Sequence, residues 1–321
     1  RTRAASTALR LYQKSGVRKL VRQSGVLERL QLDEREALLP EMSDDFFRPG
    51  REFYAAEGQR RGIVALLAGC IMSTAFAEVH RATARVLARN GFDVVVPPEQ
   101  RCCGALSIHG GDLQAGRQLA RSNIDAFETR DFDAVLSNSA GCGAAMREYD
   151  FLLRNDPQYA ERARLFVNQV KDVSEFLAEW GLSRSPGPLN ETVTYQEPCH
   201  LVHAQRVSSQ PRDLLRQIPG LKLVEMKESS LCCGSAGIYN VLQPEMSREL
   251  RERKVDNASA TGADVIVSAN PGCILQLRAG LDARGDETPV EHIMSLLDRA
   301  YQAEEASVES GNRTTARVPT S

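Results

Sequence analysis

The eight cysteines of this 321-residue chain fall into two sets of four with nearly the same spacing. The first set is Cys70, Cys102, Cys103 and Cys142, and the second set is Cys199, Cys232, Cys233 and Cys273. The gap before the adjacent pair is 32 residues in the first set and 33 in the second, and the gap after it is 39 and 40 residues. No cysteine lies outside this pattern, which indicates an internal duplication.

Each set contains two adjacent cysteines followed by a glycine. Adjacent cysteines rarely form a disulfide with each other, because the ring that this bond closes is strained. Gly104 and Gly234 allow the backbone to turn sharply and to approach a bound group closely. We therefore expect each CCG turn (Cys102–Gly104 and Cys232–Gly234) to present two neighbouring metal ligands, joined by the other two cysteines of its set.

Four converging thiols can hold a zinc ion or an iron–sulfur cluster. Structural zinc sites usually use CxxC motifs, and this chain contains none. A cluster is larger than a single ion, so ligands from three separate loops suit it better. The pattern favours iron–sulfur clusters, with [4Fe–4S] as the expected type and zinc in one half as an alternative. Disulfides and incidental buried thiols are less favoured interpretations.

Histidines near the cysteines are the next candidates. His200 and His203, in EPCHLVHAQ, are predicted as outer hydrogen-bond donors or substitute ligands, although single histidines at a helix start are more often structural. His109, after the first CCG turn, and His292, expected in the final helix, are interpreted as structural.

No catalytic residue is predicted. Glu197 and Asp150 are isolated carboxylates, which are more often solvated charges than acid–base groups. The chain has no G-x-G-x-x-G fingerprint, no P-loop and no G-x-S-x-G elbow, so the known dinucleotide, nucleotide and hydrolase motifs do not apply.

Short apolar runs rich in Val and Ile lead to the cysteines and are expected to be buried strands. They cover residues 62–70, 92–98, 132–142, 191–199, 221–226 and 263–273. Helical spacing from Phe76 to Leu87, closed by Asn90-Gly91, is typical of the helices between them. The predicted class is α/β, with two duplicated βα units, mainly parallel sheets related by a pseudo-twofold, and a helical N-terminal segment. The cysteines then follow the carboxyl ends of strands, where open sheets gather ligands.

The bulk properties limit the possible partners. A net charge of −2 gives no reason to expect nucleic acid, and no apolar run is long enough to be a transmembrane segment. A long chain with few cysteines favours a reducing compartment. We expect a helical linker or docking segment at 1–60, a first cysteine-rich domain at 61–185 (the first half), a second at 186–302 (the second half), and a disordered tail at 303–321.

The motifs resemble the tandem cysteine-rich CCG domains of heterodisulfide reductase, anaerobic glycerol-3-phosphate dehydrogenase and lactate-utilisation proteins. They are most similar to the iron–sulfur subunit of bacterial glycolate oxidase. The resemblance is carried by NSAGCGAAMREYDFLLRNDPQYAERA, EPCHLVHAQRV, SSLCCGSAGIYNVLQPEMSRELRERKVDN and VSANPGCILQLRAG, and it spans residues 62 to 300.

The resemblance implies an electron-transfer subunit of an oxidoreductase complex. A separate flavoprotein partner would oxidise glycolate, D-lactate or a related 2-hydroxy acid. The iron–sulfur subunit would pass the electrons toward a quinone, which implies a cytoplasmic protein that works at the inner face of the cytoplasmic membrane. The resemblance implies that all eight cysteines are ligands.

Two departures from the related families leave alternatives open. Family members begin with a ferredoxin-like domain, whereas residues 1–60 contain no cysteine. The heterodisulfide reductase pattern also ends each repeat with a further cysteine, where this chain has Ala145 and Gln276. The alternatives are a disulfide or quinone reductase subunit, and a zinc-bound docking module without a redox role.

Overall fold

The computed structural model describes residues 2–30 and 32–315. Its strands form two sheets among these residues. The strands are β1 (Phe53–Tyr54), β2 (Gly62–Leu66), β3 (Phe92–Val95), β4 (Ala134–Ser137), β5 (Val170–Asp172), β6 (Thr192–Gln196), β7 (Lys222–Val224), β8 (Val265–Ser268) and β9 (Val290–His292).

The two sheets repeat one topology. The strand order is β1-β3-β2-β4-β5 in the first half and β7-β6-β8-β9 in the second. All pairings are parallel except that of β1 with β3. Without β1, the order β3-β2-β4-β5 matches β7-β6-β8-β9 strand for strand. The predicted α/β class with two duplicated units is confirmed.

Helices fill the connections between the strands. They are α1 (Thr2–Lys14), α2 (Val17–Gln23), α3 (Val26–Arg29), α4 (Asp33–Ala37), α5 (Ile71–Thr74), α6 (Ala77–Arg89), α7 (Ala105–His109), α8 (Leu113–Phe127), α9 (Ala140–Arg147), α10 (Tyr149–Leu153), α11 (Ala160–Gln169), α12 (Val173–Trp180), the π-helix η1 (His200–Ala204), α13 (Ser209–Arg216), α14 (Tyr239–Leu242), α15 (Pro244–Ser259), α16 (Pro271–Asp282) and α17 (Ile293–Thr315). None of the helices in the described part of the chain combines the length and apolarity needed to cross a bilayer.

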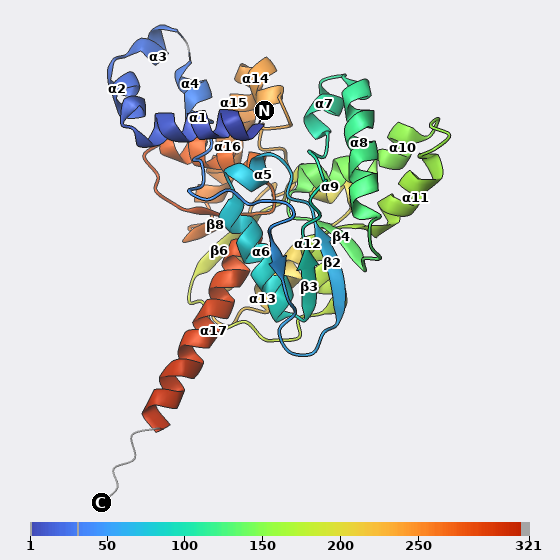
Figure 1. Ribbon diagram of the computed structural model, residues 1–321. Helices are drawn as coiled ribbons and strands as arrows, with labels where there is room; N and C mark the ends of the chain where they lie inside the picture. The colour runs from blue at the N-terminus through green and yellow to red at the C-terminus, as the bar shows by residue number, and fades with distance from the viewer. Residues whose placement is uncertain (1, 31, 316–321) are drawn as a thin grey trace, which may run out of the picture.

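One hydrophobic core joins the two halves. It contains buried side chains from α6 and α12 of the first half and from α13 and α17 of the second. Arg85 of α6 makes an ion pair with Asp298 of α17 at 2.7 Å. Figure 1 shows α17 running along α6 and then extending away from the sheets. The halves are therefore packed against each other through their inner helices.

The N-terminal segment is partly integrated into the first half. α1–α4 form a helical group beside α15 and α16 (Figure 1), but Phe47 is fully buried in the shared core and β1 pairs with β3. The predicted linker thus includes a strand that completes the first sheet, and the buried aromatic side chain of Phe47 anchors this segment in the core.

Two expectations about the C-terminal region were wrong. His292 is the last residue of β9 and precedes the final helix. Residues 303–315, expected in a disordered tail, belong to α17 in the structure; Ala303, Glu304 and Glu305 are good helix formers that extend a helix already anchored in the core. Residues 316–321 lie outside the described residues.

Candidate metal centres

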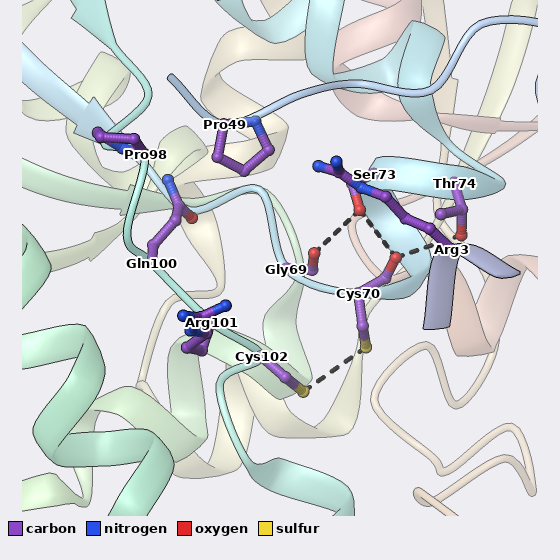
Figure 2. A pocket seen from close by; sticks show the side chains of 10 residues that line it. All are labelled: Arg3, Pro49, Gly69, Cys70, Ser73, Thr74, Pro98, Gln100, Arg101 and Cys102. Carbon is purple, nitrogen blue, oxygen red and sulfur yellow. Dashed lines mark hydrogen bonds between the residues drawn. The ribbon is translucent and has the colours of Figure 1, made fainter. Parts of the chain in front are cut away.

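The four thiols of the first set come from the carboxyl ends of three strands. Cys70 follows β2 and begins α5, the CCG turn follows β3, and Cys142 lies in the first turn of α9 after β4. The Sγ atoms of Cys70 and Cys102 are 3.6 Å apart, and Figure 2 shows these two side chains pointing toward each other. The predicted position of the cysteines beyond the strand ends is what the structure shows.

Buried polar side chains hold the first set in place. Gln100 accepts from the Ala68 amide at 2.7 Å and donates to the Leu66 carbonyl, which fixes the loop that leads to Cys70. Asn123 of α8 donates to the Cys102 carbonyl at 3.1 Å, and the Tyr149 hydroxyl donates to the Cys103 carbonyl at 2.7 Å. The side chains that hydrogen-bond to the two cysteine carbonyls of the first CCG turn are therefore neutral.

The second set repeats this placement. Cys199 follows β6 and precedes η1, its CCG turn follows β7, and Cys273 lies in the first turn of α16 after β8. The Gly234 amide donates to Cys232 Sγ at 3.4 Å, and Asn270 Nδ2 donates to Cys273 Sγ at 3.3 Å. Donors of this kind stabilise a thiolate over a thiol.

Within each set the thiols influence one another's protonation. The pKa of Cys102 is lowered to about 3 because Cys103 and Cys70 donate to its sulfur. The pKa of Cys232 is lowered to about 2 by Cys199 and Cys233. The pKa values of Cys103 and Cys233 are raised, first because each donates to its neighbour and also because both are buried. Each set is thus one coupled group of four sulfurs.

Both sets face one cavity of about 250 Å³. Seven of the eight cysteines line it: Cys70, Cys102, Cys103, Cys142, Cys199, Cys233 and Cys273. Asn270 connects the two sides, because its Oδ1 accepts from the Gly141 amide at 3.2 Å while its Nδ2 bonds Cys273. Sequence spacing predicted two separate ligand sets, and the structure adds that they meet at a shared space.

The donor chemistry fits iron–sulfur ligation. All eight cysteines are free thiols, and each set supplies four sulfurs, which is the number that a cluster takes. Among the described residues, no group of three or more His, Cys, Asp or Glu side chains is arranged to hold a single metal ion. A zinc site needs four sulfurs about 2.3 Å from one point, so the zinc alternative gains no support from this geometry.

The histidines that line the cavity are not the pair expected from the sequence. His200 lines the cavity, and its Nδ1 is 3.6 Å from Cys199 Sγ. His109, which was interpreted as structural, also lines the cavity, with its ring centre 5.6 Å from that of His200. His203 is exposed, and its Nε2 is 3.4 Å from the Ser230 carbonyl, outside the cavity.

The two predicted glycines adopt left-handed backbone conformations, with φ of +85° at Gly104 and +88° at Gly234. A Cβ at Gly104 would meet only ordinary contacts at 3.6 Å, whereas a Cβ at Gly234 would lie 2.4 Å from the Ser247 carbonyl oxygen. Gly234 therefore permits close packing against α15 as well as a sharp turn.

Several residues near the centres were not identified from the sequence. Glu197, expected to be solvated, is buried and pairs with Arg212 at 2.6 Å. Asn123, Tyr149 and Lys254 were not singled out. Aligning the two halves at the offset of the last cysteines, 131 residues, places Asn123 opposite Lys254, and this difference in charge was the signal available in the sequence.

Comparison with known proteins supports the same assignment. The family model "Cysteine-rich domain" (CCG) matches residues 64–147 and again 193–278, and "Glycolate oxidase iron-sulfur subunit, linker region" matches residues 1–39. A crystal structure of a hypothetical protein from Helicobacter pylori has a TM-score of 0.54 at 12% identity, covering 84% of this chain and 53% of that one. That likeness concerns the fold alone.

Two curated relatives are more similar in sequence. The chain is 42% identical to the probable glycolate oxidase iron-sulfur subunit of Bacillus subtilis (strain 168), over 92% of this chain and 68% of the relative. It is 34% identical to the glycolate oxidase iron-sulfur subunit of Escherichia coli (strain K12), over 75% of this chain and 58% of the relative. The chain belongs to the family of glycolate oxidase iron-sulfur subunits, with two copies of the CCG cysteine-rich domain.

Proposed function

We propose that this chain is the electron-transfer subunit of a glycolate or D-lactate dehydrogenase complex. Each cysteine set holds one iron–sulfur cluster, of the [4Fe–4S] type. A flavoprotein partner subunit oxidises the 2-hydroxy acid, and electrons pass through this chain toward a quinone at the inner face of the cytoplasmic membrane. When bound, the clusters supply one-electron acceptors that can be reduced and reoxidised without a change in covalent structure.

The observation that carries the proposal is the shared cavity between two sets of four thiols. Two centres that face the same space can exchange an electron without a path through the sheets. The chain's own residues provide the thiolates, and the amides and side chains that donate to them stabilise their charge.

The two alternatives are less well supported. A disulfide reductase of the heterodisulfide type would need the further cysteine. Its positions hold Ala145, which is buried in the core of the first half, and Gln276, which donates to Ser247 at 2.9 Å. A docking module without redox activity would not require eight free thiols in two coupled sets.

The proposal can be tested by mixing the anaerobically purified full chain with its flavoprotein partner and glycolate or D-lactate. The visible thiolate-to-iron absorbance should decrease when the 2-hydroxy acid is added. A variant with Ser at Cys102, Cys103, Cys232 and Cys233 is the control and should show no change. An active flavoprotein that leaves the absorbance of the wild-type chain unchanged would contradict the proposal.

A further inference from the structure

We propose that Lys254 gives the centre of the second set a higher reduction potential than the centre of the first set, so that electrons collect in the second half. This inference rests on the proposed iron–sulfur function and adds a direction to it. Lys254 is a positioning and tuning residue, because it contacts the loop that carries the ligands and does not contact a substrate.

The two helices that support the CCG turns correspond residue by residue. α8 and α15 align at a constant offset of 131, and five of the six buried positions of α8 are also buried in α15; Ala126, whose partner Asn257 is half-buried, is the exception. Two of these five buried pairs differ in charge: Ala120 corresponds to Arg251, and Asn123 corresponds to Lys254.

In the first half the position is neutral. Asn123 Nδ2 donates to the Cys102 carbonyl, and its Oδ1 accepts from the Arg101 amide at 2.7 Å. The side chain therefore fixes the loop without placing a net charge beside the thiols.

In the second half a buried cation occupies this position and holds the segment that leads to the CCG turn. Lys254 has 0% exposure, and its Nζ donates to the carbonyls of Glu228 and Ser229, just ahead of the CCG turn. The carboxylate of Glu228 bonds to Arg253 and Asn257 instead. Lys254 therefore has no carboxylate hydrogen-bonded to its ammonium. Burial lowers the pKa of Lys254, while the thiols of the second set and the nearby Glu228 carboxylate act to raise it, so its charge interacts with those thiols.

A second substitution supports the first. Tyr149 in the first half corresponds to Gly280 in the second, where a Cβ would lie 3.1 Å from Arg251 Cγ. Val255 and the aliphatic part of Arg251 lie where the tyrosine side chain would begin, and the buried Nε of Arg251 has no hydrogen-bond partner. Where the first half has the neutral residues Ala120 and Asn123, the second half thus has two buried cationic residues, Arg251 and Lys254.

A buried unpaired cation is costly unless an anion compensates it. A four-thiolate centre is such an anion, and adding one electron increases its negative charge. Lys254 stabilises the reduced state more than the oxidised state, because charges interact strongly in a poorly solvated interior, and this raises the reduction potential. One electron then leaves the first centre, which is oxidised, and reduces the second, with no bond formed or broken.

The test is an anaerobic redox titration of the full chain, followed by EPR. In the wild type, the signal that disappears in the Cys232→Ser, Cys233→Ser variant should be the one with the higher potential. Lys254→Met should lower the potential of that centre and leave the other unchanged. Lys227→Met is the matched control: it removes the same charge from an exposed position beside Glu228 and should shift neither potential.

The inference is overturned if the higher potential belongs to the first set, or if Lys254→Met shifts both centres equally or neither. If the Lys254→Met variant does not bind a second cluster, the inference is tested only by which centre has the higher reduction potential in the wild-type chain. If both clusters are present but the first centre has the higher reduction potential, the role of Lys254 is refuted and the proposed function remains intact. A wild-type chain that binds no iron and sulfide would overturn both.

Discussion

In the first half Asn123 and Tyr149 bond the carbonyls of the CCG turn, whereas in the second half Ser247 bonds the turn and a buried lysine, Lys254, bonds the segment just ahead of it. Apart from β1, strand order and thiol placement are the same in both halves, and the supporting helices α8 and α15 bury five of six equivalent positions. After the duplication, the ligands were therefore retained while the side chains around them diverged. The difference suggests that the two centres have the same ligands and different electrical environments.

The largest expected effect is the loss of one cluster without the other when the adjacent cysteines of one set are replaced. Replacing Cys232 and Cys233 by Ser removes half of the second set, and the same change at Cys102 and Cys103 removes half of the first. Each variant should lose about half of the bound iron and sulfide, because each centre depends only on its own four thiols. Loss of all iron in either variant would show that the two sets do not act independently.

The glycines of the two CCG turns should differ in their tolerance of a side chain. Gly104→Ala is expected to cost about 1–2 kcal/mol of folding free energy through its positive φ alone. Gly234→Ala should cost about 3 kcal/mol or more, because the new Cβ also meets the Ser247 carbonyl at 2.4 Å. Chemical denaturation measures both, and equal losses would contradict the packing difference.

The equivalent residues at the ends of β5 and β9, one in each half, should respond oppositely to pH. Asp172 ends β5 and His292 ends β9, and each accepts from an amide at the start of the next helix. Burial raises the pKa of Asp172 from 3.8 to about 6, so its contribution to stability is lost as pH rises through that range. Burial lowers the pKa of His292 from 6.5 to about 4, so its contribution is lost as pH falls below 6.5.

Variants at these positions reveal the two contributions. His80, also buried with a pKa lowered to about 4 by burial, acts in the same direction as His292. Asp172→Asn should therefore make stability rise more steeply between pH 4 and 6.5, and His292→Gln should flatten the rise. Denaturation at several pH values tests this, and identical slopes in both variants would exclude it.

The smallest expected effect concerns the hydroxyl of Tyr149, whose equivalent position in the second half is Gly280. Tyr149→Phe removes the hydrogen bond to the Cys103 carbonyl and the one that Asn123 donates to the hydroxyl. The expected loss is about 1–2 kcal/mol in free energy of unfolding. Ser247→Ala, which removes the hydroxyl that donates to the Gly234 carbonyl at 2.8 Å, is the matched change in the second half and should have a similar cost.

The sequence was sufficient for the features that local pattern determines. Apolar runs closed by Gly, Pro or Asn placed the strands, and cysteine spacing placed each thiol after a strand end. It was not sufficient for the meeting of the two sets at one cavity, because that depends on how α6, α12, α13 and α17 pack. His109 was missed for the same reason, since its neighbour His200 lies in the other half of the chain.

Misassigned residues have physical causes too. His292 was placed in a helix because β9 spans only three residues, too few to produce an alternating pattern. Glu197 was expected in solvent because its partner Arg212 lies 15 residues away and the ion pair that permits its burial is tertiary.

The most direct test of the central claim is the iron, acid-labile sulfide and zinc content of the full chain purified without oxygen, with EPR after dithionite reduction. The account predicts roughly equal amounts of iron and sulfide and a reducible signal from each set of thiols. Zinc without sulfide would contradict it, and would make the eight cysteines structural ligands.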